Sequence, residues 1–308
     1  MVHRHPVSTN HSSQTPSSYE PQALFSGYHL RLLDDSMTHA LRLHILGSGS
    51  KGNCELIEGP EGIIMVDNGF SRREVLRRMA ELELEASRVV ALVVTHEHSD
   101  HVKGLPVWCK SFPGALLASS GTPQARATLE GLPFTEFEPG ACLDIAGIEV
   151  QTFSTSHDVV NPIGLRFSCR NDSIGIMTDT GTATEAALKA LGDVRILALE
   201  SNHDVPMLRT GSYPRYLQDR IISERGHLSN AQAAEAAHSL VGPHTEQLVA
   251  MHISQENNRP SLAVRALAEA LGAELDNELG SSATLRRPDP LPSLHIRAAG
   301  QNRPISIW

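Results

Sequence analysis

An apolar run in this chain is followed directly by a segment rich in histidine. Residues Val89–Val94 are aliphatic and mostly β-branched, which predicts a buried strand. The next residues, Thr95 to His101, include three histidines and one aspartate. The pattern therefore predicts that this polar segment is the loop at the C-terminal end of a buried strand.

Similar apolar runs alternate with amphipathic segments over residues 39–278, which we predict to be one domain. Further strands are expected at residues 41–46, 54–58, 63–67, 115–118, 148–153, 165–169, 174–177, 196–199 and 248–251. Helices are expected at residues 71–83, 183–191, 230–240 and 260–271, the first with Ser71 as N-cap and Glu74 at the capping-box position. Helices flanking two sheets predict the α/β class, as a four-layer αββα sandwich.

The two ends of the chain lack this periodicity. Residues 1–38 are rich in Ser, Thr, Pro, Asn and His, so we expect a disordered tail, with Met37 as an alternative start. Residues 279–308 carry four prolines and are expected to form a loose C-terminal tail.

Composition narrows the class of protein. The net charge of −9 disfavours a generally basic nucleic-acid-binding surface but not a local basic groove, and the aromatic content of 4% argues against many base-stacking side chains. The four cysteines form no C-x-x-C pair, and we expect reduced thiols. The sequence also has no apolar stretch long enough to span a membrane and no apolar core of a signal peptide, so we expect a cytoplasmic protein.

A glycine-rich segment at residues 47–52 matches the G-x-G-x-x-G pattern of dinucleotide-binding folds. Such folds need a helix directly after it, whereas the residues here continue as a predicted strand. We therefore expect the glycines to allow a tight turn beneath the histidine-rich loop, where Lys51 and Asn53 are candidates to contact a substrate phosphate.

The order H-x-H-x-D-H fits a site for two adjacent metal ions. On an extended backbone His96 and His98 point the same way, and Asp100 and His101 then turn toward a second position. Imidazole suits borderline metals such as zinc, and carboxylate suits harder ions. A solvated polar loop is the alternative in a chain with 16 histidines.

Three more candidate ligands stand where other apolar runs stop. They are His157, Asp179 and His252. Any one of them alone would be an ordinary polar strand end, but the three in this order after the histidine-rich loop form a far more specific pattern.

Seven motifs in the chain match those of a known family. They are LGSGSKGNC (46–54), DNGFS (67–71), THEHSDHVKGL (95–105), TDTG (178–181), ESNHD (200–204), GHLSN (226–230) and HISQENN (252–258). Over residues 41–272 the chain resembles the metallo-β-lactamase-fold hydrolase superfamily, most closely its YycJ/WalJ-like branch, with relation to RNase Z and the PhnP-type phosphodiesterases.

The resemblance implies a site for two divalent metal ions, with zinc or manganese favoured and iron also compatible. It implies that one ion is bound by His96, His98 and His157, the other by Asp100, His101 and His252, and that Asp179 bridges both. Asp67 would support the metal loop by hydrogen bonding. Closing a turn with Asn68 and Gly69 is an equally compatible role for Asp67.

Two such ions would activate a shared hydroxide as nucleophile, oriented by Asp100. Glu200 and His227 resemble the pair that protonates the leaving oxygen in RNase Z-like enzymes. A strand-end salt bridge and a helix-capping loop are the alternatives for these two residues. His203 either touches substrate or supports Glu200.

Other polar residues are candidates for substrate contact. Asn257 and Asn258 are expected either to donate hydrogen bonds to substrate or to cap the helix at Pro260. A segment with interleaved arginines and tyrosines is either a phosphate-backbone contact or a solvated helix face. Its residues are Arg209, Tyr213, Arg215, Tyr216, Arg220 and Arg225.

The leading hypothesis from the resemblance is a metal-dependent phosphodiesterase, a 5′-to-3′ DNA exonuclease acting in DNA repair, with DNA as its partner and substrate. A hydrolase of small or cyclic phosphodiesters is the alternative enzyme. A regulatory binding protein without catalysis is the alternative from another class. Hydrolysis of β-lactams or thioesters is disfavoured because the Glu200–His227 pair suits phosphate esters.

Overall fold

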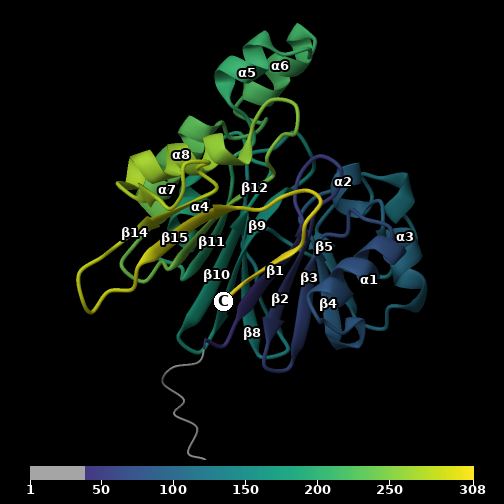
Figure 1. Ribbon diagram of the computed structural model, residues 1–308. Helices are drawn as coiled ribbons and strands as arrows, with labels where there is room; N and C mark the ends of the chain where they lie inside the picture. The colour runs from purple at the N-terminus through teal and green to yellow at the C-terminus, as the bar shows by residue number, and fades with distance from the viewer. Residues whose placement is uncertain (1–38) are drawn as a thin grey trace, which may run out of the picture. The chain divides into compact units, whose positions relative to one another are not determined.

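Two β-sheets packed face to face form the centre of the computed structural model, which describes residues 39–308 (Figure 1). The first sheet comprises β1 (Arg42–Gly47), β2 (Cys54–Gly59), β3 (Gly62–Val66), β4 (Val89–Val94), β5 (Ala115–Ser119), β6 (Phe134–Phe137) and β16 (Ile305–Ile307). Its strand order is β16-β1-β2-β3-β4-β5-β6. The disordered tail predicted for residues 1–38 lies outside the described residues.

The second sheet comprises β7 (Cys142–Ile145), β8 (Ile148–Ser154), β9 (Ile163–Cys169), β10 (Asp172–Met177), β11 (Ile196–Glu200), β12 (Gln247–Met251), β13 (Glu274–Leu275), β14 (Ser282–Leu285) and β15 (Leu294–Ala298). Its strand order is β13-β14-β15-β12-β11-β10-β9-β8-β7. Among residues 39–308, no helix is both long enough and apolar enough to cross a membrane.

Helices cover the outer face of each sheet (Figure 1). The first sheet carries α1 (Arg72–Glu81), α2 (Ser99–Val102) and α3 (Leu105–Trp108), and the second carries α4 (Glu185–Leu191), α7 (Asn230–Leu240) and α8 (Pro260–Leu271). One hydrophobic cluster fills the space between the sheets, and one further cluster lies under each helical layer. This arrangement confirms the predicted αββα sandwich.

The central strands of each sheet are parallel, so their carboxyl ends lie at the same edge of the fold. β3, β4 and β5 pair in parallel, as do β10, β11 and β12. Strands covered on both faces are apolar throughout, and in open α/β sheets ligands bind beyond the carboxyl ends of such strands. Polar residues directly after these strands therefore gather at one edge of the sandwich.

The first helix begins as predicted at its N-cap but lacks the reciprocal capping box. Ser71 Oγ accepts a hydrogen bond from the Glu74 main-chain nitrogen. The Glu74 carboxylate binds Arg77 and Arg78 instead of reaching back to the cap. Helix α1 ends at Glu81, two residues earlier than expected.

The prediction of a loose C-terminal tail at residues 279–308 is wrong. β14 and β15 pair with each other, β15 pairs in parallel with β12, and β16 closes the first sheet beside β1. These strands have four, five and three residues. Segments so short show little periodicity, and what stabilises them is pairing with strands far away in the sequence.

Two helices lie outside the layers. They are α5 (Val205–Thr210) and α6 (Arg215–Ile222), which project beyond the sheets at the top of Figure 1. They connect the end of β11 to the segment that precedes α7. This α5–α6 arm begins directly after Glu200-Ser201-Asn202-His203, so it stands next to the predicted site.

Candidate metal centre

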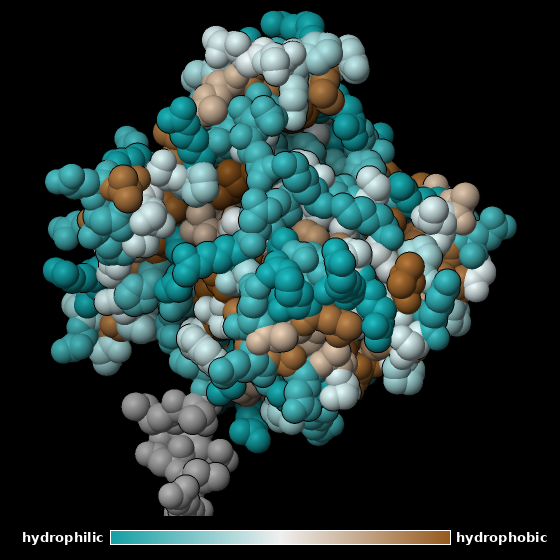
Figure 2. Space-filling model, turned by 45° about the vertical axis from the view of Figure 1, so that its right-hand side comes forward, coloured by the Kyte–Doolittle hydropathy of each residue, from teal (hydrophilic) through white to brown (hydrophobic). Residues whose placement is uncertain are grey.

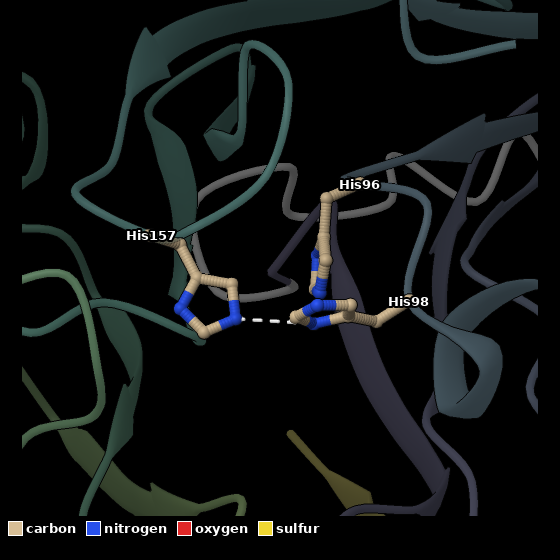
Figure 3. Close-up of side chains that lie close together, drawn as sticks. All are labelled: His96, His98 and His157. Atoms are coloured by element: carbon tan, nitrogen blue, oxygen red, sulfur yellow. Dashed lines mark hydrogen bonds between the residues drawn. The ribbon is translucent and has the colours of Figure 1, made fainter. Parts of the chain in front are cut away.

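Three histidines from two separate loops meet at the edge of the sandwich (Figure 3). His96 and His98 follow β4, and His157 follows β8 on the other sheet. Their ligand atoms lie within 4.8 Å of one another. His98 Nδ1 and His157 Nε2 are 3.1 Å apart, the contact drawn dashed in Figure 3. The sequence analysis grouped the same three side chains.

A second group contains Asp100, His101 and His252, again with ligand atoms within 4.8 Å. His252 follows β12. His101 Nδ1 donates to Asp67 Oδ2 at 2.7 Å, and Asp67 also accepts hydrogen bonds from the main chain and hydroxyl of Thr95. Asp67 therefore fixes the orientation of His101 and holds the start of the metal loop.

Asp179 lies between the two groups. It belongs to one cluster with His96 and His101 and to another with His252 and the Glu200–His227 pair. Its Oδ2 lies 3.3 Å from His101 Nε2 and 2.9 Å from His252 Nδ1. Asp179 and His252 have positive φ angles of 52° and 48°. Left-handed backbone is uncommon for these residues and is concentrated at functional sites.

The chemistry of these groups fits a divalent cation. His96 Nε2 is buried and has no hydrogen-bond partner among residues 39–308, although leaving such a group unpaired costs about 1–3 kcal/mol. Burial lowers the pKa of His96 well below its usual value and lowers that of His157, so both are neutral. His157 Nδ1 donates to the Gly226 carbonyl, which leaves the Nε2 lone pair facing the cluster.

The field at the second group attracts positive charge. Burial alone would lower the pKa of His101 and His252, but the Asp179 carboxylate raises both well above their usual values. A site that holds protons this strongly also attracts a cation, and metal binding would displace those protons. Together, the side chains of both groups support divalent metal binding.

Glu200 and His227 form a hydrogen-bonded pair beside these groups. His227 Nδ1 donates to Glu200 Oε1 at 2.7 Å. Burial would raise the pKa of Glu200, but His227 lowers it to about 2, so this fully buried carboxyl is ionised. Its second oxygen accepts hydrogen bonds from the main chain of Thr180 and Leu228. The His227 imidazole is therefore held in a fixed orientation, and the His227 side chain remains 16% exposed.

An open cavity of about 320 Å³ gives access to the centre. Residues from both metal groups line it, together with His227. Its other lining residues are Ser50, Ser99, Arg126, Asn202, Tyr213, Leu217, Arg220, Ile221 and Ser254. The volume lies at the small end of the range for ligand pockets, so the cavity holds only a small part of a polymeric substrate.

The residues that line this cavity do not include the five predicted substrate contacts, which are Lys51, Asn53, His203, Asn257 and Asn258. The amide of Asn53 is buried and lies 3.3 Å from Asp100 Oδ2 and 2.9 Å from His101 Nε2, so it supports the metal loop. Asn258 is buried against Asn230 and Ser201.

The remaining candidates have different surroundings. Lys51 donates its main-chain N–H to Gln301, and Asn257 is buried with its main chain bonded to Ser254 and Asp204. His203 is fully buried, and in the described part of the chain neither of its ring nitrogens has a hydrogen-bond partner. Burial lowers its pKa to about 4, so His203 is a neutral buried side chain.

Gln301 is a supporting residue that has no signal in the sequence, because residues 279–308 show little hydrophobic periodicity. Its Oε1 accepts from the Lys51 main chain at 2.8 Å, and its Nε2 donates to the Gly52 carbonyl at 2.7 Å. In the loop so held, Asn53 Oδ1 accepts from the Gly49 main chain at 2.7 Å. The C-terminal segment thus holds the loop that positions Asn53 against Asp100 and His101.

Replacing Gln301 by alanine should weaken metal binding by about 10-fold or more, the usual effect of removing a group that orients metal ligands. Titration of metal-free protein with Zn²⁺ measures this change. The matched control is Asn302→Ala, because Asn302 is the exposed neighbour. Equal zinc affinity in the two variants would contradict this role for Gln301.

Comparison with known proteins agrees with the geometry. The family model of the beta-lactamase superfamily domain matches residues 63–253. Exodeoxyribonuclease WalJ of Streptococcus pneumoniae is 35% identical over 243 residues, covering 75% of this chain and 90% of the relative. Exodeoxyribonuclease YycJ of Bacillus anthracis is 33% identical over 235 residues, covering 75% and 89%.

A solved structure shows the same fold. The metallo-beta-lactamase fold protein YhfI from Bacillus subtilis matches with a TM-score of 0.60 at 13% identity, covering 87% of this chain and 99% of that one. The chain belongs to the beta-lactamase superfamily, with the metallo-β-lactamase fold, in the branch that includes WalJ and YycJ.

Proposed function

We propose that this protein is a metal-dependent phosphodiesterase that acts on DNA as a 5′-to-3′ exonuclease in DNA repair. The observation that carries the proposal is the meeting of two ligand groups around Asp179, next to the Glu200–His227 pair and an open cavity. The two relatives are named exodeoxyribonucleases. The four cysteines are all free thiols, which supports a place in the cytoplasm.

The centre is proposed to hold two divalent ions, with zinc or manganese favoured and iron also compatible. His96, His98 and His157 would bind one, and Asp100, His101 and His252 the other, with Asp179 shared. When bound, the ions supply Lewis acidity for the phosphate and make a water nucleophilic near neutral pH.

The protein residues have separate tasks in the reaction. The Asp100 carboxylate faces the cavity and is anchored by the Asn53 amide, so it can accept and orient the proton of an attacking water. His227 faces the same cavity, with Nδ1 held by an ionised carboxylate. We assign to this oriented imidazole the task of donating a proton to the leaving oxygen.

A hydrolase of small or cyclic phosphodiesters is the second candidate. The cavity volume of about 320 Å³ favours it, as does the net charge of −9. Both enzymes would share the metal chemistry but differ in what binds outside the cavity.

End-labelled DNA duplex, single-stranded DNA, RNA and bis-p-nitrophenyl phosphate, each with and without chelator, test the proposal. We expect chelator-sensitive release of nucleotides from DNA 5′ ends, and restored activity after zinc or manganese is added. Turnover of bis-p-nitrophenyl phosphate without any cleavage of DNA would support the second candidate instead. No turnover of any ester by metal-loaded protein would contradict both.

A further inference from the structure

Arg126 is a cavity-lining arginine that the sequence analysis did not single out. It directly precedes a 3-10 turn at Ala127–Leu129, between β5 and β6. Its Nη1 donates to the Glu97 carbonyl at 3.1 Å and its Nε donates to Thr128 Oγ1 at 3.2 Å. Both of these partners are neutral oxygens, and within residues 39–308 Arg126 forms no ion pair with a carboxylate, so its charge is not neutralised.

The other arginine of the cavity wall is neutralised. Arg220 binds Asp158 through two hydrogen bonds of 2.6 and 2.9 Å. Asp158 in turn lies 3.7 Å from His157 Nε2 and 3.9 Å from His98 Nε2. Arg220 therefore ties the α5–α6 arm to the metal loops.

Two further arginines of the arm have a carboxylate partner, because Arg209 and Arg215 pair with Asp219. Arg225, which follows the arm, donates to the His157 carbonyl and is not among the residues that line the cavity. The hypothesis of a phosphate-binding arginine segment is thus not supported for these side chains, and Arg126 is the better candidate.

Arg126 is held in place by the metal loop itself. Glu97 lies between His96 and His98, and its side chain accepts a hydrogen bond from the Val160 main chain at 2.9 Å. The Glu97 carbonyl that receives Arg126 is therefore fixed relative to both histidines. A guanidinium whose partners are neutral oxygens keeps its positive charge and can still donate hydrogen bonds to an anion. Because the side chain is already held in place, it loses little conformational entropy when the anion binds.

The cavity around Arg126 suits part of a nucleotide chain. Tyr213 lines the same cavity, and an aromatic ring is a side chain on which a base can stack. Figure 2 shows one face of the molecule, on which hydrophilic residues predominate and hydrophobic residues lie among them. The scissile phosphate belongs at the metal groups, so the charge of Arg126 is available to another phosphate.

We propose that Arg126 binds a phosphate next to the scissile one and so makes the site selective for polynucleotides over small phosphodiesters. The inference rests on the proposed nuclease function. A bidentate arginine–phosphate contact adds affinity only for a substrate that carries a second phosphate. Bis-p-nitrophenyl phosphate has none.

The test compares Arg126→Ala and Arg126→Lys with the wild-type enzyme on a labelled oligodeoxynucleotide and on bis-p-nitrophenyl phosphate. For Arg126→Ala, the ratio of kcat/KM on DNA to that on the small ester should fall about 10-fold, mainly through KM. The slope of log KM against log salt on DNA should decrease by about one unit, as for one lost phosphate contact. Arg126→Lys, which keeps the charge, should restore most of that slope.

The matched control is Arg73→Ala, which removes the same charge from an exposed position on α1. It should leave both the ratio and the slope unchanged. Equal losses on both substrates in Arg126→Ala would mean a structural role only, and no change in ratio or slope would also overturn the inference. If the wild-type enzyme hydrolyses the small ester but not DNA, the proposed function itself fails, and this inference with it.

Discussion

Asp179→Asn should reduce kcat on DNA by on the order of 10³-fold or more. Asp179 is the carboxylate shared by both ligand groups, and its Oδ2 lies within 3.3 Å of His101 and His252. An amide cannot neutralise two cations, so one ion or both should be lost. Elemental analysis of the purified variant, with single-turnover kinetics, measures both changes.

Asp144→Asn is the matched control for this variant, because Asp144 is an exposed carboxylate on β7. It should keep full activity and full metal content. A thermal unfolding curve for Asp179→Asn distinguishes a lost ion from a lost fold. Wild-type metal content with wild-type kcat in folded Asp179→Asn would contradict the shared-ligand role.

His227→Ala and Glu200→Gln should each slow DNA cleavage by about 10²–10⁴-fold, as expected when a general acid is removed. The two residues act as one unit joined by a 2.7 Å hydrogen bond, so the double variant should be no slower than the worse single one. Rates on DNA for the two single variants and the double variant measure this.

The leaving group provides a second readout for the same pair. p-Nitrophenolate departs with little help from a proton, whereas the alkoxide of a deoxyribose needs one. The loss on bis-p-nitrophenyl phosphate should therefore be at most about 10-fold, with metal content unchanged. An equal loss on both substrates would mean that His227 orders the metal groups and does not protonate the leaving oxygen.

Much of this site could be predicted because its residues follow buried strands. The apolar run before Thr95 predicts where a strand ends. Asp179, Glu200 and His252 likewise stand at the ends of apolar runs. In a doubly covered sheet these ends share one edge, so a sequence pattern becomes a spatial cluster. The αββα layers follow from the same alternation of apolar strands and amphipathic helices.

What could not be predicted depends on contacts between distant segments. β16 has three residues, and its place beside β1 has no local signal. For the same reason Gln301 could not be connected to the loop at Gly52. Asn53 is a predicted substrate contact because its turn is expected to lie beneath the histidine-rich loop, yet its amide is buried against Asp100 and His101. Arg126 stands alone in an irregular segment, so only the folded chain brings it to the cavity.

Anomalous X-ray diffraction from crystals of the zinc- or manganese-loaded protein tests the central claim most directly. Two peaks are predicted, one in contact with His96, His98 and His157 and one in contact with Asp100, His101 and His252, with the Asp179 carboxylate between them. Metal-loaded crystals with no peak among these side chains, or with ions bound only elsewhere on the surface, would contradict it.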